Sequence, residues 1–498
     1  MRKGREGVYY IGVDLGTSSV KLLLMDGKGV IHNQLSLDYP LEFPQPGWAQ
    51  QDPENWKRAV LTGIPRLLEG FDAGLVAGIG AGGQMHGLVV LDEEDRVIRP
   101  AILWNDGRTA KEVDYLNAVV GKQTLSQRTA NIAFAGFTAP KLLWLRENEP
   151  EHFKRIAKIM LPKDYINYIL TGVHCTDYSD ASGTLLLDVE HKRWSPEMLE
   201  LCGVCEAQMP RLFESWQSVG TLRPEIAQAL GLSESVTVCA GAGDNAAAAV
   251  GTATVGDGAC NISLGTSGTV FIASDRFGVD PHNALHAFAH ADGRWHLMGC
   301  MLCAASCNKW LMEEIFQTED YAAEQAPISE EALGRGPVFF LPYLMGERSP
   351  INDTDARGAF VGMSMDTTRA DMTQAVLEGV AFALRDSVEV ARSLGLSVNK
   401  SMLCGGGAKS PLWRKILANV LNMELTVPAS EQGPAMGGAM LAMVACGEYE
   451  SVEAVCKALV RVADTISPEA ELVARYEAQY QKFRAIYPAM KDLFPELR

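Results

Sequence analysis

The stretch "YYIGVDLGTSSVKLLLMDGKGVI", Tyr9–Ile31, decides the fold of this chain. Two β-branched and apolar runs, Val8–Val13 and Val20–Met25, predict buried strands. Between them lies the polar bend "DLGTSS", which offers backbone N–H groups and hydroxyls as donors. The bend does not fit the spacing G-x-x-x-x-G-K-[ST] of a P-loop. Alone, the segment fits a structural hairpin as well as a phosphate-binding one, and Asp14 beside the bend is a suitable ligand for hydrated Mg²⁺.

A second copy of this bend lies in the other half of the chain. The segment "ISLGTSGTVFIASD", Ile262–Asp275, again has a strand, a Gly-Thr-Ser bend and a strand. A hairpin with a purely structural role has no reason to recur at the matching place of both halves. We therefore expect two facing hairpins, one in each domain, that hold the phosphates of one nucleotide.

The rest of each half alternates between strand-like and helical segments. In the first half, apolar runs at 76–80 and 88–91 precede a helical pattern over 108–120. In the second half, a helical pattern near 370–394 leads to the strand "SMLCGGGAKS". This alternation predicts an α/β sheet with covering helices in each domain. At 498 residues the chain is too long for one core, and we place the domains at 1–253 and 254–498.

Composition excludes several classes of protein. The chain is 47% hydrophobic and 21% charged, and its net charge of −17 without a basic stripe argues against a nucleic-acid partner. The most apolar long segment, Gly74–Leu91, is interrupted by glycines, Gln84 and His86, so no membrane span is expected. The basic start "MRKGREG" does not predict a signal peptide. Eleven cysteines without a secretion signal indicate a reducing, cytoplasmic location.

Two cysteine pairs have C-x-x-C spacing. They are Cys202 with Cys205 and Cys300 with Cys303, and Cys307 follows the second pair by one helical turn. Zinc or redox chemistry fits this spacing. However, the pairs are far apart in the chain and no histidine or acidic residue has ligand spacing beside them. We therefore expect core thiols.

Two further motifs carry groups suited to catalysis. In "GAGDNAAAAVG", Asp244 precedes an alanine run with high helix propensity, so it is placed at a helix N-terminus, where the dipole favours an ionised base. A plain N-cap aspartate is the alternative. In "GGQMHG", Gln84, Met85 and His86 follow a glycine-rich strand end, where open α/β sheets place ligands. There His86 is suited to donate to a hydroxyl, and a structural histidine is the alternative.

At this point the sequence resembles the FGGY carbohydrate kinases, which share a fold with actin, hexokinase and heat-shock chaperone ATPases. The family signatures are matched by "GFTAPKLLWLREN", Gly136–Asn148, and "GAFVGMSMDTTRADMTQAVLEG", Gly358–Gly379. The resemblance is strongest to members that phosphorylate a pentulose. It rests on "GAGGQMHGLVVLD", "RPAILWNDGR", "LPKDYINYILTG", "SDASGTLLLDV", "GAGDNAAAAVG" and "LPYLMGERSP". It implies an α/β fold of two actin-like, ribonuclease H-like ATPase domains with a cleft between them.

The resemblance also implies ATP and Mg²⁺ as cofactors, a pentulose as substrate, and roles for individual residues. Asp244 becomes the general base, and Asp14 helps to hold Mg·ATP through water. The residues implied for the sugar are Gln84, Met85, His86, Trp104, Asn105, Asp106, Asp244 and Asn245. Those implied for the nucleotide are Gly16, Thr17, Ser18, Gly265, Thr266, Ser267, Gly405, Gly406, Gly407 and Lys409. Pro434 starts a helix with small residues on one face, which suits packing beside adenine or ordinary domain packing.

Two alternatives remain open from the sequence. Another FGGY kinase acts on ribulose, a different pentulose, a polyol or a sugar acid, because each hydroxyl contact discriminates strongly. An actin-fold ATP-binding switch works on protein partners instead, but it lacks the base or carries an added interaction domain. Family members are often homodimers, and the sequence leaves the oligomeric state and the role of "GERSP" open.

Overall fold

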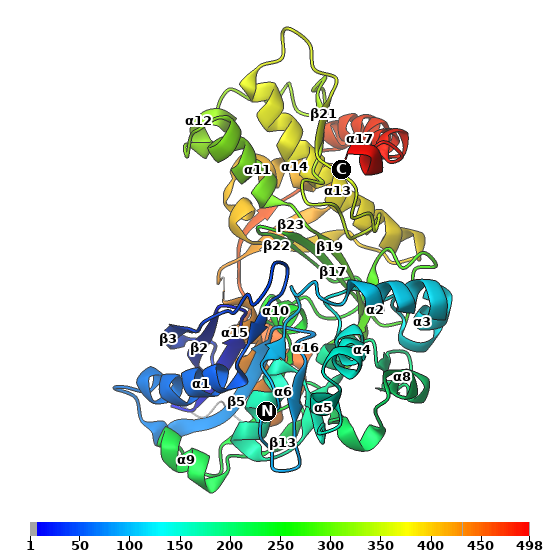
Figure 1. Cartoon of the computed structure of the whole chain (residues 1–498). Helices are drawn as coiled ribbons and strands as arrows, with labels where there is room; N and C mark the ends of the chain where they lie inside the picture. Colours follow the sequence, from blue (N-terminus) through cyan, green and yellow to red (C-terminus); the bar gives the residue numbers. More distant parts are fainter. Residues whose placement is uncertain (1–6, 431, 498) are drawn as a thin grey trace.

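The two Gly-Thr-Ser hairpins form the centres of two separate sheets (Figure 1). We describe residues 7–430 and 432–497 of a computed structural model. The first hairpin pairs β1 with β2 in antiparallel register, and β1 also pairs with β5 in parallel. The sheet of this first lobe has the order β13-β14-β5-β1-β2-β3, with β15 beside β5. Its strands are β1 (Tyr9–Leu15), β2 (Ser19–Asp26), β3 (Ile31–Asp38), β5 (Val76–Gly83), β13 (Ser218–Thr221), β14 (Thr237–Cys239) and β15 (Ala242–Gly243).

The second lobe contains a sheet of the same design. Its order is β18-β19-β17-β16-β22-β23-β24, with β16 and β17 forming the second hairpin. Its strands are β16 (Cys260–Leu264), β17 (Gly268–Ser274), β18 (His286–Ala289), β19 (Trp295–Met301), β22 (Lys400–Cys404), β23 (Glu424–Pro428) and β24 (Val462–Ile466). In both lobes the hairpin is flanked by an antiparallel strand on one side and two parallel strands on the other. The predicted duplication of an α/β sheet is confirmed.

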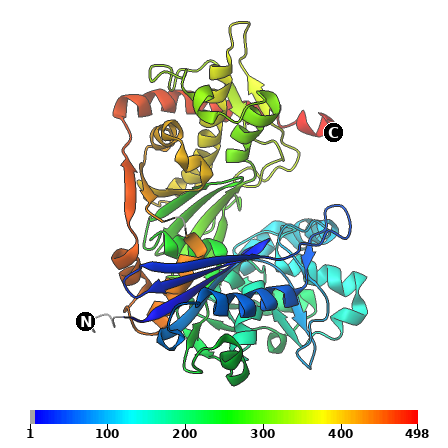
Figure 2. The same ribbon diagram turned by 90° about the vertical axis from the view of Figure 1, so that its left-hand side faces the viewer.

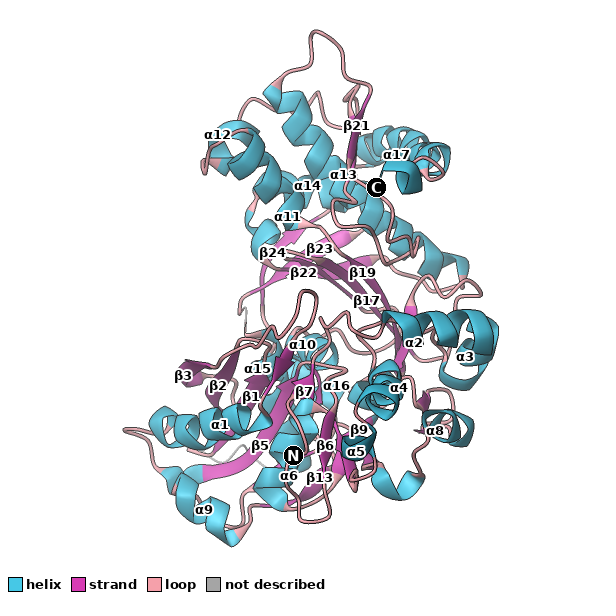
Figure 3. Cartoon of the chain, in the orientation of Figure 1, coloured by secondary structure: helices cyan, strands magenta, loops and turns pink. Residues whose placement is uncertain are grey.

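Helices cover the sheets, and several start where the sequence predicts. Asp52 caps α1 by accepting from Glu54 N, as expected from its Asp-Pro pair. The helical pattern at 370–394 is α13. In the second lobe the helices lie on the side of the sheet that faces away from the first lobe (Figure 3). The main helices of the two lobes include α1 (Pro53–Leu67), α4 (Thr138–Asn148), α6 (Pro162–Thr171), α10 (Asp244–Gly251), α11 (Ala305–Trp310), α13 (Arg369–Ser393), α14 (Pro411–Leu421) and α17 (Ala470–Met490).

Two helices from the second half of the chain pack onto the first lobe. They are α15 (Gly433–Ala445) and α16 (Val452–Leu459), after which β24 returns the chain to α17 in the second lobe (Figure 2). Glycines allow this close approach, since a Cβ on Gly12 of β1 would lie 1.9 Å from Ala435 O, and one on Gly437 would lie 1.9 Å from Ala247 O. The small residues of α15 therefore serve its packing against the first lobe, although α15 and α16 follow residue 254 in the chain.

Shorter elements complete the lobes. The pattern at 108–120 forms α2 (Ala110–Asp114) and a wider π-type turn over Tyr115–Gly121. The short helices are α3 (Lys122–Thr129), α5 (Pro150–Phe153), α7 (Tyr178–Ser182), α8 (Pro196–Cys202), α9 (Pro224–Leu230) and α12 (Tyr321–Gln325). Two-stranded pairs are β4 (Gln50–Gln51) with β7 (Ala101–Ile102), β6 (Val89–Leu91) with β8 (Lys158–Met160), β9 (Cys175–Asp177) with β12 (Arg211–Phe213), β10 (Leu187–Asp188) with β11 (Arg193–Trp194), and β20 (Phe339–Leu341) with β21 (Ala359–Val361).

The cysteines with C-x-x-C spacing are all free thiols. Cys202, Cys303 and Cys307 are buried, as expected for core thiols, whereas Cys300 is half-buried and Cys205 is exposed. The core interpretation is therefore wrong for Cys205. Within 7–430 and 432–497, no helix has both the length and the apolar character that crossing a bilayer requires.

Candidate active site

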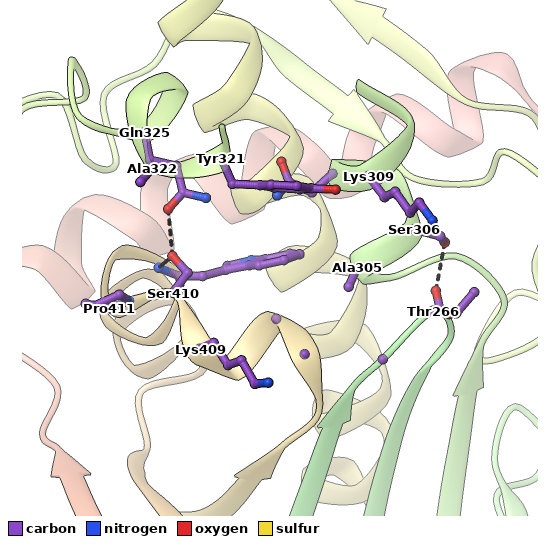
Figure 4. A pocket seen from close by; sticks show the side chains of 15 residues that line it. Thr266, Ala305, Ser306, Lys309, Tyr321, Ala322, Gln325, Lys409, Ser410 and Pro411 are labelled. Atoms are coloured by element: carbon purple, nitrogen blue, oxygen red, sulfur yellow. Dashed lines mark hydrogen bonds between the residues drawn. The ribbon is translucent and has the colours of Figure 1, made fainter. Parts of the chain in front are cut away.

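A cavity of about 730 Å³ opens beside the second hairpin (Figure 4). Its size is within the range of small-molecule sites. Five residues implied for the nucleotide line it, namely Gly265, Thr266, Gly406, Gly407 and Lys409. The other lining residues are Ala305, Ser306, Asn308, Lys309, Tyr321, Ala322, Gln325, Ser410, Pro411 and Trp413. The triple-glycine turn and the second hairpin thus meet at one cavity.

The outer wall of this cavity was not apparent from the sequence. Figure 4 shows the ring of Tyr321 on the α12 side and Lys409 on the opposite side. Ser410 Oγ donates to Gln325 Oε1 at 2.7 Å and also caps α14, so it connects the two walls. The Ser-Pro pair that starts α14 is a readable N-cap signal, but α12 carries no motif. Its tyrosine and glutamine reach the cavity only through tertiary packing.

The second hairpin is fixed to the start of α11. Thr266 O accepts from Ala304 N at 2.9 Å and from Ser306 Oγ at 2.7 Å, and Gly265 O accepts from Ala305 N at 2.8 Å. These bonds occupy the carbonyls of the bend, while the side chains of Thr266 and Ser267 remain exposed. The bend is thereby held in position with its hydroxyls accessible to a ligand.

Gly405 does not line the cavity, in contrast to the two glycines that follow it. Its φ is +91°, and a Cβ there would lie 2.7 Å from the backbone of Leu264. Gly405 therefore lets the turn after β22 approach the second hairpin, and its predicted contact with nucleotide is replaced by a packing role.

In the first hairpin, the groups of Gly16 are used internally. Its N–H donates to Ser19 O at 3.0 Å, and its carbonyl accepts from Tyr39 Oη and Gln84 Nε2. The Gly16 amide is thus not free for a phosphate. Thr17 Oγ1 accepts from Trp104 Nε1 at 2.9 Å, and Ser18 is exposed. The hydroxyls of this bend remain its candidate ligand groups.

The side-chain amide of Gln84 supports the first hairpin. It is 2% exposed, and its Nε2 donates to Gly16 O and to Gln51 Oε1 at 3.2 Å. Its Nε2 therefore holds the hairpin in place, whereas its Oε1 has no hydrogen-bond partner among the described residues, and the contact of Gln84 with sugar stays a prediction.

Asp14 lies next to the end of β1, Asp244 begins α10, and the charge of Asp14 acts on Asp244. Burial, followed by the negative charge of Asp14, raises the pKa of Asp244 to about 7. Burial also raises the pKa of Asp14 to about 6. Asp244 is at a helix N-terminus as predicted. Burial and the like charge of Asp14 thus oppose the effect of the helix dipole, and the role of Asp244 as a base stays a prediction.

Asn245 connects Asp244 with Met85. Its Nδ2 donates to Asp244 Oδ1 at 3.0 Å and lies 3.9 Å from Met85 Sδ. A Cβ on Gly243 would lie 2.9 Å from Met85 Cγ, so the glycine before the aspartate leaves room for the methionine. Three residues implied for the sugar thus meet at the start of α10.

His86 adopts a left-handed backbone conformation with φ of 70°. Its Nδ1 lies 2.6 Å from Gly183 O, and its ring stacks on Phe137 at 4.7 Å. Burial, with the charges of Lys141 and Arg348 as smaller causes, lowers its pKa to about 3. A neutral ring that donates through Nδ1 presents Nε2 as an acceptor. The prediction that His86 donates to a hydroxyl is therefore reversed.

Some residues of the "WNDGR" segment are exposed and others are buried. Trp104 is 43% exposed and its indole N–H bonds to the first hairpin. Asn105 is exposed. Asp106 is 1% exposed, and its carboxylate accepts from Arg108 and from Ala49 N. Asp106 is therefore committed to a buried ion pair, and its predicted place in the sugar pocket is not supported.

A buried polar network supports the start of α10. Lys163 Nζ lies 2.7 Å from Asp164 Oδ1 and 3.0 Å from Asp177 Oδ1. Asp177 accepts from Ser179 Oγ, which in turn accepts from Gly243 N at 3.2 Å. This network reaches the residue before Asp244. The "LPKDYINYILTG" motif supplies the lysine, but the sequence alone does not reveal the partners.

Comparisons with known proteins agree with this arrangement. Residues 9–251 match the N-terminal domain of the FGGY family of carbohydrate kinases, and residues 260–446 match its C-terminal domain. The chain is 41% identical to a xylulose kinase of Escherichia coli K12 over 490 residues, covering 97% of this chain and 99% of that one.

Solved structures give the same result. The crystal structure of a xyloylose kinase from Brucella ovis is 42% identical with a TM-score of 0.93, covering 97% of this chain and 100% of that one. A gluconate kinase from Lactobacillus acidophilus is 26% identical with a TM-score of 0.93, covering 98% of this chain and 99% of that one. This chain belongs to the FGGY family of carbohydrate kinases.

Proposed function

We propose that this chain is a xylulokinase, which transfers the γ-phosphoryl group of ATP to the C5 hydroxyl of D-xylulose and releases D-xylulose 5-phosphate and ADP. The observation that carries the proposal is the contact of Asp244, Asn245 and Met85 at the start of α10, which brings a candidate base to the sugar residues. The 41% identity to the E. coli xylulose kinase over nearly the whole chain supports the choice of sugar.

In this proposal the first lobe binds the sugar and activates it. Asp244 accepts the proton of the C5 hydroxyl as the phosphoryl group is transferred, and Asn245 orients that carboxylate through its amide. Met85 packs against the carbon chain of the sugar. His86 accepts a hydrogen bond from a sugar hydroxyl through Nε2, because its Nδ1 is bonded to Gly183 O.

The second lobe binds the nucleotide. Gly406, Gly407 and Tyr321 line the cavity where the adenosine is held. Thr266 and Ser267 meet the β- and γ-phosphates from the second hairpin, and Lys409 adds positive charge near the phosphates. The hydroxyls of Thr17 and Ser18 approach the same phosphates from the first hairpin. Closure of the lobes excludes water and limits ATP hydrolysis.

Asp14 fits a role in holding Mg²⁺ through water. Among the described residues, no hydrogen-bond donor contacts its carboxylate, and the repulsion between Asp14 and Asp244 favours a cation between carboxylate and phosphates. Oxygen ligands and retained waters are what Mg²⁺ prefers. When bound, Mg²⁺ neutralises charge that develops on the phosphates during transfer.

The proposed partners are small molecules, with no nucleic acid and no membrane. The enzyme is proposed to act in the cytoplasm, as a homodimer. Light scattering on the purified protein measures the oligomeric state. A monomer at assay concentration would contradict the homodimer but would not affect the proposed reaction.

A sugar panel tests the reaction. ADP release with Mg·ATP is measured with D-xylulose, D-ribulose, L-ribulose, xylitol, gluconate and no sugar. We expect the highest kcat/KM with D-xylulose. A higher value with ribulose or gluconate identifies a different FGGY kinase. Equal ADP release with and without every sugar would instead favour an ATP-binding switch.

A further inference from the structure

The "GERSP" segment, Gly346–Pro350, is fixed to the end of β19 by its backbone. Glu347 is 2% exposed, and its Oε1 accepts from Leu302 N at 2.9 Å and from Arg348 N at 2.7 Å. On the other side, Ser349 N donates to Cys300 O at 3.0 Å. Bonds before and after Arg348 thus hold its backbone where β17 and β19 border the first lobe (Figure 1).

The side chain of Arg348 crosses from the second lobe to the first. Its guanidinium carbon lies 5.3 Å from the centroid of the Phe134 ring, and its other neighbour is the thiol of Cys300. The ring of Phe134 packs edge-on against Phe137 at 5.6 Å, and Phe137 stacks on His86. Arg348 is therefore brought from the second lobe to the end of the sugar site that contains His86.

Arg348 has no ion-pair partner. Across the described part of the chain, no carboxylate lies within 4.0 Å of its guanidinium. The buried arginines that hold the fold together differ in this respect, since Arg108 pairs with Asp106, Arg99 with Glu149 and Arg385 with Glu477. A half-buried guanidinium with five N–H donors and no carboxylate has hydrogen bonds left to give.

The charge of Arg348 is felt by groups on both sides of it. Burial is the main cause that lowers the pKa of His286, and the Arg348 charge is the next. Burial raises the pKa of the Cys300 thiol, which also senses the charges of both Arg348 and Asp244. These effects agree with the ring contacts that bring Arg348 towards His86.

The donor and acceptor patterns of Arg348 and His86 are complementary. A guanidinium only donates, and His86 Nε2 accepts because Nδ1 is bonded to Gly183 O. A sugar hydroxyl can donate to Nε2, and a ketone or hydroxyl oxygen can accept from the guanidinium. The pair therefore fits two neighbouring oxygens of a sugar, one that donates to His86 and one that accepts from Arg348.

We propose that Arg348 is a substrate-binding residue contributed by the second lobe, which donates hydrogen bonds to an oxygen of the pentulose beside the one that contacts His86. The inference rests on the proposed function, since it assumes a ketopentose substrate. It also explains why a sugar would draw the lobes together, because His86 and Arg348 belong to different lobes.

Arg348→Ala, Arg348→Gln and Arg348→Lys test the proposal. We expect R348A and R348Q to raise the KM for D-xylulose at least tenfold while the KM for ATP changes less than twofold, with R348K between them and wild type. Arg357→Ala is the matched control, because Arg357 is on the same loop and donates to Thr354 O and Ala356 O. R357A should retain wild-type constants.

Two outcomes would overturn the inference. The first is an unchanged KM for D-xylulose in folded R348A or R348Q, with folding checked by thermal melting. The second is an equal rise in the KM for ATP. If wild type itself leaves D-xylulose unphosphorylated, the proposed function fails as well. If wild type is active and the variants retain its KM, the assignment of Arg348 alone fails.

Discussion

Ser179 Oγ accepts a hydrogen bond from Gly243 N at 3.2 Å, immediately before Asp244 in the chain. The same hydroxyl donates to Asp177, whose other oxygen lies 3.0 Å from Lys163 Nζ. The position of the candidate base is thus fixed by a buried hydrogen-bond network as well as by α10 itself.

Removing this hydroxyl should displace the base. Ser179→Ala leaves Gly243 N–H without a partner, which costs about 1–3 kcal/mol, whereas Asp177 Oδ2 still accepts from Ser179 N and Ser215 Oγ. We expect kcat to fall about tenfold, since small displacements at a reacting centre are costly. Steady-state kinetics and a thermal melt measure both effects. Ser233→Ala, at an exposed serine, is the control. An unchanged kcat in S179A would contradict the role of Ser179 in positioning Asp244.

Activity should depend on pH through Asp244. A general base works as the carboxylate, and the pKa of Asp244 is raised to about 7, so the active form is present above pH 7 and is lost as the pH falls below it. We expect kcat/KM for the sugar to fall about tenfold per pH unit below 7. Asp14→Asn removes a neighbouring negative charge and should shift this fall to lower pH. A wild-type fall centred near pH 4 would contradict the account.

The close packing of α15 on α10 in the first lobe should not tolerate a methyl group. A Cβ on Gly437 would lie 1.9 Å from Ala247 O, so Gly437→Ala must separate α15 from α10. We expect a loss of ~3 kcal/mol, seen as a Tm lower by roughly 5–10 °C. Gly433→Ala on the same helix is the control, since its nearest atom would be at 3.8 Å. Equal Tm values for the two variants would disprove the packing argument.

The α12 side of the cavity should affect the binding of nucleotide and not the binding of sugar. Tyr321 lines the cavity of the second lobe, and an aromatic ring there stabilises a bound base by stacking. We expect Tyr321→Ala to raise the KM for ATP about tenfold and to leave the KM for sugar unchanged. Tyr115→Ala, at a residue 41% exposed, is the control. A change confined to the KM for sugar would place the nucleotide elsewhere.

The sequence predicted the features that depend on local pattern. The two hairpins, the duplicated α/β sheets and the helix start at Asp244 all follow from periodicity and turn residues. Met85, Asn245 and Asp244 do meet, and the second hairpin and the triple-glycine turn do share a cavity.

The remaining features depend on tertiary contacts that no local pattern encodes. Asp106 is paired with a buried arginine two residues away, and the Gln84 amide is bonded to the first hairpin. The acceptor state of His86 depends on Gly183, which is distant in the chain. Likewise α15 crosses to the first lobe, and Tyr321 reaches the cavity from a helix without a motif.

The most direct test of the central claim compares wild type with Asp244→Asn, using Mg·ATP and D-xylulose. We expect wild type to form ADP and sugar phosphate in equal amounts, and only when the sugar is present. D244N should bind ATP and D-xylulose with similar affinity by calorimetry, while kcat falls by at least about 10²-fold. Wild-type turnover by D244N, or equal ADP release with and without sugar, would contradict the assignment of Asp244 as the base.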